Sequence, residues 1–429
     1  MGVFSKPVAM LMALLQALFA VAGVPTERHI RNDGKPVNLY VNGLLGYGEK
    51  SGLHYVLPSM GMTGNIAHML EDEGYEFYVS SVEPFASNWD RACSLYAEIT
   101  GTRVDYGEAH AQRCGHPRYG REYKKPLIED WGPDRPLNLW GYSMGGQTVQ
   151  LFASLLAQGS AQERAVTPAD ALSPLFAGGG EGLVHSVTTL NGSLNGSTIE
   201  VAGLNNLSYK EWFILPVFAF MMFWGSIGPL NGLFDVGLGH FGLSGTGGAS
   251  LLHIPEVRNL DAYFSSNDNA FYDLSPAGAQ EVNFMSETLE DVYYFSYASC
   301  IAQQDGAGAW SVPIGQLLNN PVDYLFGGRI SAGAGYYYGQ TFQSPGGEFT
   351  IDESWLPNDG QVNLVSAQYP FGAPHRQFDA RNIERGAWQV MPTLEGRSHL
   401  YFAGLNTKYD TAHLFATYLA HMKILDETY

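Results

Sequence analysis

Short apolar runs alternate with segments of helical periodicity along the first third of the chain. Three runs have the length and the β-branched or aromatic content of buried strands, at 37–41, 76–80 and 136–140. Two further segments, 64–74 and 147–156, place apolar residues at helical spacing. This alternation predicts the α/β class, with a mostly parallel sheet that carries helices on both faces.

The N-terminus has the pattern of a targeting segment. One basic residue, Lys6, precedes an apolar run over 8–22 that ends in the small-residue pattern Ala20-Val21-Ala22. Such a run is too short to span a bilayer comfortably, so we predict a signal peptide over 1–22 and a secreted protein, with a membrane anchor as the alternative. No later stretch reaches 18 uncharged apolar residues, so no integral membrane segment is expected in the mature chain.

Composition narrows the functional classes. The chain has 429 residues, of which 45% are apolar, which supports a sizeable core and argues against disorder. Its 23 basic and 42 acidic residues give a net charge of −19, which argues against a nucleic-acid partner. Three cysteines allow one disulfide at most, and their spacing does not choose the pair: Cys93, Cys114 and Cys300.

The strongest chemical motif lies between the third predicted strand and the helix that follows it. Residues 141–146 read Gly-Tyr-Ser-Met-Gly-Gly and fit the pattern G-x-S-x-G. In a strand-turn-helix context this pattern is typical of a nucleophile elbow, a tight turn that lifts a serine hydroxyl to the end of a sheet. Ser143 is therefore the candidate nucleophile.

A serine hydroxyl needs a base to take its proton, and in this fold the partners follow in the order serine, acid, histidine. Asp359 lies in a predicted turn and His399 lies near the C-terminus, so these two residues are the candidate acid and base. Spacing alone leaves three rival histidines: His375, His413 and His421. The last two fall on a terminal helical pattern, where surface or packing roles are expected.

Several longer segments resemble one bacterial lipase family, the staphylococcal and thermoalkaliphilic Geobacillus-type lipases. The most specific are Ser-Asn-Trp-Asp-Arg-Ala-Cys at 87–93, Val-Asp-Tyr-Gly-Glu-Ala-His-Ala at 104–111 and Gly-His-Pro-Arg-Tyr-Gly-Arg at 115–121. Three more carry the likeness: Gly-Tyr-Ser-Met-Gly-Gly-Gln-Thr at 141–148, Ser-Val-Thr-Thr-Leu at 186–190 and Trp-Leu-Pro-Asn-Asp-Gly-Gln-Val-Asn at 355–363. The resemblance covers about 36–425 and implies an α/β-hydrolase fold, hydrolysis of triacylglycerols and other esters, a helical lid and a zinc-bearing insertion.

The resemblance implies the same triad as the motif analysis: Ser143, Asp359 and His399. It also implies an oxyanion hole made by two backbone N–H groups, those of Leu44 and Met144. The family usually has His-Gly before the first of these donors, whereas this chain has Asn42-Gly43. This difference leaves open what anchors the loop.

The resemblance further implies a structural zinc site in an insertion at about 86–130. Three family ligands match Asp90, His110 and His116. Glycine stands at Gly239, where we place the family's fourth ligand, so His240 is the first expected replacement, with Asp235 or water as alternatives. The family's calcium site is not expected, because Tyr401 and Asn406-Thr407 stand where it has carboxylates.

The most apolar stretch of the mature chain is 212–224. A core helix and a mobile lid over an apolar cleft both explain it, and the resemblance favours a lid within about 200–245. The sequence thus predicts a secreted triacylglycerol lipase that acts at a lipid–water interface. Three alternatives remain: a short-chain carboxylesterase, an acyltransferase, and a catalytically idle α/β-hydrolase that serves as a binding module.

Overall fold

A computed structural model describes most of the chain. The described residues are 29, 34–48, 66–201, 211, 215–216, 219, 236–243, 254–316, 323–324, 337–404 and 411–429. The predicted signal peptide lies outside them, and so does the predicted lid stretch 212–224 apart from three positions.

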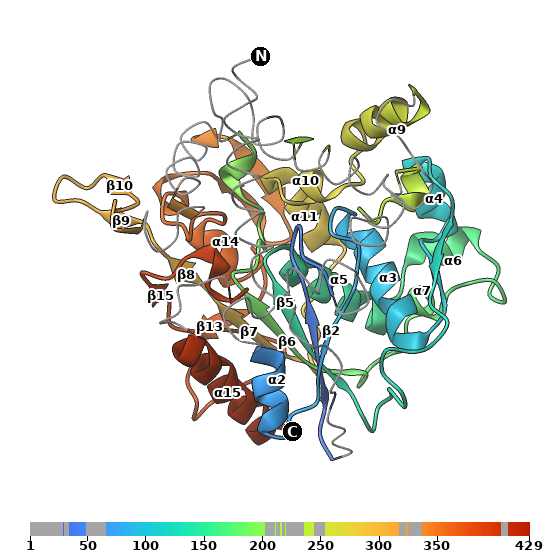
Figure 1. The fold of residues 1–429 in the computed structure, drawn as a ribbon, viewed down its shortest axis with the longest axis horizontal. Helices are drawn as coiled ribbons and strands as arrows, with labels where there is room; N and C mark the ends of the chain where they lie inside the picture. The colour runs from blue at the N-terminus through green and yellow to red at the C-terminus, as the bar shows by residue number, and fades with distance from the viewer. Residues whose placement is uncertain are drawn as a thin grey trace.

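A seven-stranded sheet forms the centre of the molecule, and every strand pairing in it is parallel (Figure 1). In spatial order its strands are β13 (His375–Gln377), β14 (Trp388–Val390), β7 (Tyr293–Tyr297), β6 (Val184–Leu190), β5 (Leu137–Tyr142), β1 (Val37–Val41) and β2 (Phe77–Val79). All residues of β1, β5 and β6 are buried. Strands covered on both faces read as continuous apolar runs, which is why the sequence revealed β1 and β5 directly.

Each face of the sheet packs against its own helices. One core cluster joins Leu39 and Leu139 to the helices α3 (Asn88–Thr100) and α5 (Met144–Gln158). The other joins Tyr40 and Trp140 to α2 (Ile66–Asp72) and α15 (Thr411–Thr428), which lie side by side in Figure 1. Successive strand residues thus supply opposite faces, and the predicted α/β class with helices on both faces is confirmed.

The remaining elements are short and lie around this core. The helices are α4 (Glu108–Cys114), α6 (Ala161–Val166), α7 (Pro174–Ala177), α9 (Ile254–Ser265), α10 (Ala270–Asp273), α11 (Pro276–Phe284) and α14 (Leu364–Gln368). The single-turn helices are η2 (Thr198–Val201), η5 (Gly239–Phe241), η7 (Glu353–Trp355) and η8 (His399–Tyr401). The two-stranded pairs are β3 (Arg103–Asp105) with β4 (Tyr119–Glu122), β8 (Ser299–Cys300) with β15 (Leu394–Glu395), β9 (Gln303–Gln304) with β10 (Trp310–Ser311), and β11 (Thr341–Ser344) with β12 (Gly347–Thr350).

Two local differences from the sequence-based expectation concern the site. Helix α5 begins at Met144 rather than at residue 147, because the chain enters the helix directly from the turn at Ser143. Helix α3, at the start of the predicted insertion, packs against α5 and contributes Leu95 to the main core. The metal candidate Asp90 therefore lies on a helix of the core.

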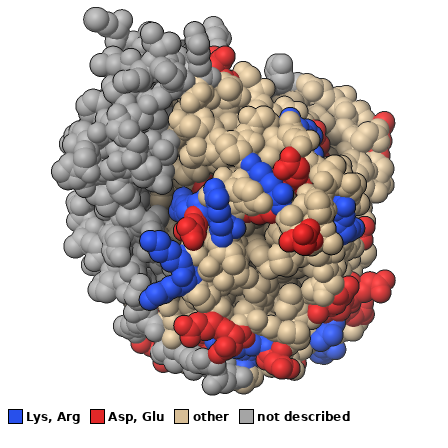
Figure 2. Space-filling model, turned by 90° about the vertical axis from the view of Figure 1, so that its right-hand side faces the viewer, with Lys and Arg blue, Asp and Glu red and all other residues tan. Residues whose placement is uncertain are grey.

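The surface and the cysteines complete the description. On the described part of the face that carries α4 and α6, basic side chains lie among acidic ones rather than forming a continuous basic area (Figure 2). All three cysteines are free. Within the described ranges, no helix has the length and apolar character that crossing a membrane requires.

Candidate active site and buried metal-type cluster

Ser143 lies in a strained turn between β5 and α5. Its backbone has φ 56° and ψ −125°, a positive φ that few residues other than glycine adopt. A side-chain carbon at Gly145 would lie 2.1 Å from the carbonyl oxygen of Val41, so only glycine allows α5 to start this close to β1. The turn thereby presents the Ser143 hydroxyl at the carboxyl end of the sheet, as the motif predicts.

The structure brings Ser143, His399 and Asp359 into one hydrogen-bonded chain. His399 Nε2 lies 2.9 Å from Ser143 Oγ, and His399 Nδ1 lies 2.7 Å from Asp359 Oδ2. The other oxygen of Asp359 accepts backbone N–H bonds from Gln361 at 2.9 Å and Val362 at 2.8 Å. Both nitrogens of His399 and both carboxylate oxygens of Asp359 therefore have a hydrogen-bond partner.

His399 is surrounded by negatively charged side chains. Burial by itself would lower the pKa of its imidazole, but the carboxylates of Asp359 and Asp323 outweigh burial and raise that pKa above its usual value. A raised pKa favours proton uptake by the imidazole. This is the property that a base needs when it takes the proton of a serine hydroxyl.

The three rival histidines have other surroundings. His375 is exposed and stacks on Tyr369, with 3.5 Å between the ring centroids, while His413 hydrogen-bonds to the hydroxyl of Tyr401. His421 is buried on α15, where Thr188 and Tyr297 bond its two nitrogens at 2.8 Å and 3.0 Å. Among the four histidines considered, His399 is the one that lies within hydrogen-bond distance of Ser143.

The loop with the predicted oxyanion donor Leu44 runs beside the nucleophile. A side-chain carbon at Gly43 would lie 2.6 Å from Ser143 Cβ, so the backbone here approaches the serine as closely as glycine permits. Met144, the second predicted donor, is fully buried as the first residue of α5. Met144 is therefore the chain neighbour of Ser143, and Leu44 directly follows the glycine whose backbone approaches the serine.

Arg91 anchors this loop. The sequence had left the anchor open, because Asn42-Gly43 stands where the family usually has His-Gly. Its guanidinium donates to the carbonyl oxygens of Asn42 and, at 2.7 Å, of Glu83, while its Nε donates to Thr148 Oγ1 at 3.0 Å. The side chain is fully buried, and burial lowers its pKa to about 10. One arginine thus joins the loop that carries Leu44 to α3 and α5, a role that the sequence did not reveal.

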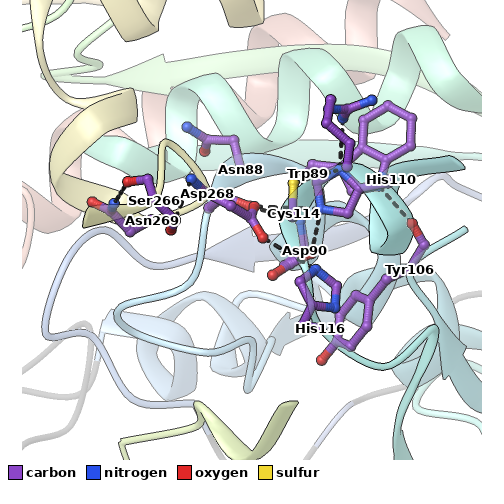
Figure 3. Close-up of polar contacts among 12 residues, drawn as sticks. Asn88, Trp89, Asp90, Tyr106, His110, Cys114, His116, Ser266, Asp268 and Asn269 are labelled. Atoms are coloured by element: carbon purple, nitrogen blue, oxygen red, sulfur yellow. Dashed lines mark hydrogen bonds and ion pairs between the residues drawn. The ribbon is translucent and has the colours of Figure 1, made fainter. Parts of the chain in front are cut away.

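A second buried cluster includes Asp90 of α3 and holds five polar side chains: Asp90, His110, His116, His240 and Asp268. Figure 3 shows Asp90, His110, His116 and Asp268 of this cluster. His110 Nε2 lies 3.2 Å from Asp90 Oδ1 and 3.3 Å from Asp268 Oδ1. His116 Nε2 lies 3.1 Å from Asp268 Oδ2, and His240 Nε2 lies 2.9 Å from Asp90 Oδ2. The three predicted ligands are thus together, and His240 is beside them.

The donor atoms of this cluster fit a cation. The facing nitrogens of all three histidines, both oxygens of Asp90 and one of Asp268 are buried without a hydrogen-bond partner. Burial alone would raise the pKa of Asp268, but His110 and His116 hold it below its usual range, so its carboxylate stays charged. Tetrahedral zinc sets neighbouring ligand atoms about 3.3 Å apart, close to the separations of 3.1–3.3 Å between the imidazoles and the carboxylates.

Contacts outside the cluster orient two of the histidines. His116 Nδ1 lies 2.9 Å from the carbonyl oxygen of Pro117, which leaves its Nε2 free to face a metal. Glu163 accepts the backbone N–H groups of Ala109 and His110 and so fixes the start of α4. Arg113 donates to His110 Nδ1 at 2.9 Å, a contact that must be released if a metal binds Nε2 of the neutral ring.

Asp268 is the residue that the sequence analysis missed. We expected His240 to replace the ligand missing at Gly239. Gly239 is the first residue of η5, His240 faces Asp90, and Asp268 adds a further carboxylate from far along the chain. Asp235 lies outside the described residues. Nothing in local spacing marks Asp268, because it lies before α10 and reaches the histidines only through the fold. Cys114 also lies within reach of His110, His116 and Asp268, as Figure 3 shows.

The sheet and its elbow define an α/β-hydrolase-like fold, and comparison with known proteins places the chain more narrowly. Residues 34–319 match the family described as "Lipase-like, C-terminal domain", and the chain belongs to this family. The lipase of Staphylococcus hyicus is 32% identical over 356 residues, which cover 82% of this chain and 51% of that protein. The chain thus spans about half the length of this curated relative.

Solved structures agree over nearly the whole chain. The crystal structure of Staphylococcus hyicus lipase has a TM-score of 0.75 and 28% identity and covers 94% of this chain and 98% of that chain. EstA from Clostridium botulinum has a TM-score of 0.74 and 29% identity, with coverage of 96% and 97%. Lipase 1 from Pelosinus fermentans has a TM-score of 0.69 and 31% identity, with coverage of 91% and 98%. The resemblance stated from the sequence is thereby confirmed.

Proposed function

We propose that this chain is a secreted serine hydrolase that cleaves carboxylic esters of lipids, most specifically triacylglycerols. The observation that carries the proposal is the hydrogen-bonded chain of Ser143, His399 and Asp359 at the end of a parallel sheet. Serine, histidine and aspartate in this geometry form the arrangement used for acyl transfer. Membership in a lipase family supports the lipid substrate.

In the proposed mechanism, His399 Nε2 takes the proton of Ser143 as its Oγ attacks the ester carbonyl. The N–H groups of Leu44 and Met144 hold the oxyanion, and the proton then passes from His399 to the leaving alcohol. Asp359 keeps Nδ1 protonated and stabilises the imidazolium. Water then enters by the same base-assisted route and releases the carboxylic acid.

We further propose that the second cluster binds a structural zinc ion through Asp90, His110, His116 and Asp268. The unpartnered buried atoms and the spacing of the ligand atoms support this choice. His240 then acts as an outer partner of Asp90, and Tyr106 lies 3.3 Å from its other nitrogen. When bound, zinc would neutralise the two carboxylates and cross-link α3 and α4 to the segment before α10.

Hydrolysis of a series of p-nitrophenyl and triacylglycerol esters, from short to long acyl chains, tests the substrate class. We expect cleavage across the series, with a steep rise for long chains once emulsion droplets form. Smooth saturation through the solubility limit would favour a plain carboxylesterase, and transfer to added alcohols in preference to water would favour an acyltransferase.

Labelling with a fluorophosphonate tests the nucleophile independently of the substrate. The wild-type chain should be labelled at Ser143, and Ser143→Ala should not be labelled. An unlabelled, folded wild-type chain would favour the idle binding module. The location of the protein after expression with residues 1–22 present tests secretion.

A further inference from the structure

A third carboxyl group, that of Asp323, lies beside the triad without belonging to it. Its side chain is fully buried. Asp323 Oδ2 accepts the backbone N–H of Leu400 at 3.1 Å, and Oδ1 accepts the side-chain amide of Gln361 at 2.8 Å. The mechanism derived above does not use this carboxyl group.

Its partners are the chain neighbours of the acid and the base. Gln361 follows Asp359 by two residues, and Leu400 directly follows His399. The hydroxyl of Ser398 on the other side of His399 also bonds to Asp323. The backbone of Gly360 packs so closely on Asp323 that a side-chain carbon there would lie 2.5 Å from Asp323 Cβ. A single carboxyl group therefore bridges the two loops on which the acid and the base sit.

Within the part of the chain that the structure describes, the titratable groups around His399 can be named for each element packed against it. From the acid loop comes Asp359, and from β5 comes Tyr142, whose ring lies 5.2 Å from the imidazole and whose pKa burial raises well above its usual value. Among the described residues, Asp323 is the second carboxyl group that acts on His399, and it raises the pKa of the imidazole together with Asp359. Burial raises the pKa of Asp323 itself, while His399, Gln361 and Ser398 oppose that rise.

We propose that Asp323 is a positioning residue for the ester-hydrolysing triad: its carboxylate ties the Asp359 loop to the His399 loop and supplies a second negative charge that favours the imidazolium. This inference rests on the proposed serine-hydrolase function. Positioning matters because a small displacement of a base from its nucleophile costs a large factor in rate. Charge matters because the imidazolium forms in the transition state.

The test is the pH profile of kcat/KM for p-nitrophenyl butyrate, a soluble ester for which interface effects do not enter. In Asp323→Asn, loss of the carboxylate lowers the pKa of His399, so the acid limb of the profile should move to lower pH. The loosened loops should reduce kcat about tenfold, with KM nearly unchanged.

Two further variants separate the effect of the negative charge of Asp323 from the effect of its hydrogen bonds to the two loops. Gln361→Ala removes one bond to Asp323 but keeps its charge, so kcat should fall modestly while the acid limb stays at the wild-type pH. Asp323→Glu also keeps the charge, and its acid limb should stay in place even if Asp323→Asn does not fold. Asp352→Asn, at an exposed acid that bonds Ser354, serves as the control and should change neither quantity.

An acid limb that stays in place or moves to higher pH in folded Asp323→Asn would overturn the proposal, and so would an acid limb that moves to lower pH in Asp323→Glu. Fluorophosphonate labelling keeps this failure distinct from failure of the proposed function. If the wild-type chain is labelled at Ser143 and the pH profiles do not differ, the triad stands and only the role of Asp323 is lost.

Discussion

The triad and the metal-type cluster are both buried polar sites, but they differ in how their atoms are satisfied. In the triad, each group bonds another group of the chain, from Ser143 through His399 to Asp359 and on to backbone N–H groups. In the cluster, carboxylate oxygens and imidazole nitrogens face one another at 2.9–3.3 Å as ion pairs, without recorded hydrogen bonds. Buried polar atoms are costly unless paired, so the chain alone completes the first site, whereas the second would gain further partners from the metal ion that we propose.

Helix α3 connects the two sites. Asp90 points into the cluster, and the next residue, Arg91, holds the oxyanion loop through the carbonyl of Asn42. A change at the cluster can therefore reach the loop that carries Leu44 through two adjacent residues of α3. The comparison predicts that the triad governs rate, that the cluster governs stability, and that Arg91 affects both.

The largest effect is expected for Ser143→Ala. Removal of the nucleophile should lower kcat by about a thousandfold or more, because only oxyanion stabilisation and binding remain. The melting temperature should stay close to that of the wild type, since loss of a strained serine removes no core contact. Ester hydrolysis and thermal unfolding check the two statements, and retention of more than a tenth of the activity would contradict the proposed role of Ser143.

Next in size is the loss of the ion. Strong chelation, or His116→Asn, should lower the melting temperature by about 5 °C or more while the initial rate at 25 °C changes little, because unpaired buried charges destabilise the fold. Elemental analysis should find about one zinc per wild-type chain and none in His116→Asn. The exposed His375→Asn is the matched control.

The choice of the fourth ligand sharpens this prediction. If Asp268 is the ligand, Asp268→Asn loses zinc and His240→Gln keeps it. The opposite result would restore His240 as the ligand expected from the sequence. Wild-type protein that holds no zinc, and whose melting temperature does not respond to added zinc, would show that the cluster is not a metal site.

Arg91→Met should have an intermediate effect on rate. Loss of the bond to the Asn42 carbonyl frees the loop that carries Leu44, so kcat should fall about 10- to 100-fold with KM nearly unchanged. Thr148→Val removes the partner of Arg91 Nε but leaves the contact with Asn42, so its kcat should stay within a few-fold of wild type. Arg91→Lys, which keeps a donor, should recover part of the loss. Equal losses of kcat in Arg91→Met and Thr148→Val would show that the effect comes from general packing and not from the bond to Asn42.

The smallest effect concerns a histidine that the fold keeps neutral. Burial lowers the pKa of His421 to about 3, below the unfolded value near 6.5. Its contribution to stability is therefore present above about pH 6.5 and is lost as the pH falls toward 3. At pH 5.5 the loss is about 1 kcal/mol relative to pH 7.5. Chemical denaturation at the two pH values, compared with His421→Gln, measures this difference; an equal pH response in both proteins would contradict it.

The sequence revealed those parts of the molecule that depend on local pattern. Strands β1, β2 and β5 appear as apolar runs because the sheet is covered on both faces, and Ser143 appears because its turn requires glycines at fixed positions. The order of serine, acid and histidine then led to Asp359 and His399. The structure brings these three side chains together, and the inferences were possible because each rests on neighbours in the chain or on a fold-wide order of elements.

The sequence pattern did not reveal the residues whose roles depend on contacts with distant parts of the chain. Asp268 joins the histidines of the cluster, Arg91 reaches the loop at Asn42, and Asp323 bridges the loops of Asp359 and His399. No chemical motif marks any of the three residues for this role, and each gains its role when folding buries it among partners from other segments. The sequence alone determined the class of fold and the candidate reacting groups, because periodicity and turn chemistry are local. Only the tertiary structure decided what holds those groups in place, because burial pairs charges that are far apart in the chain.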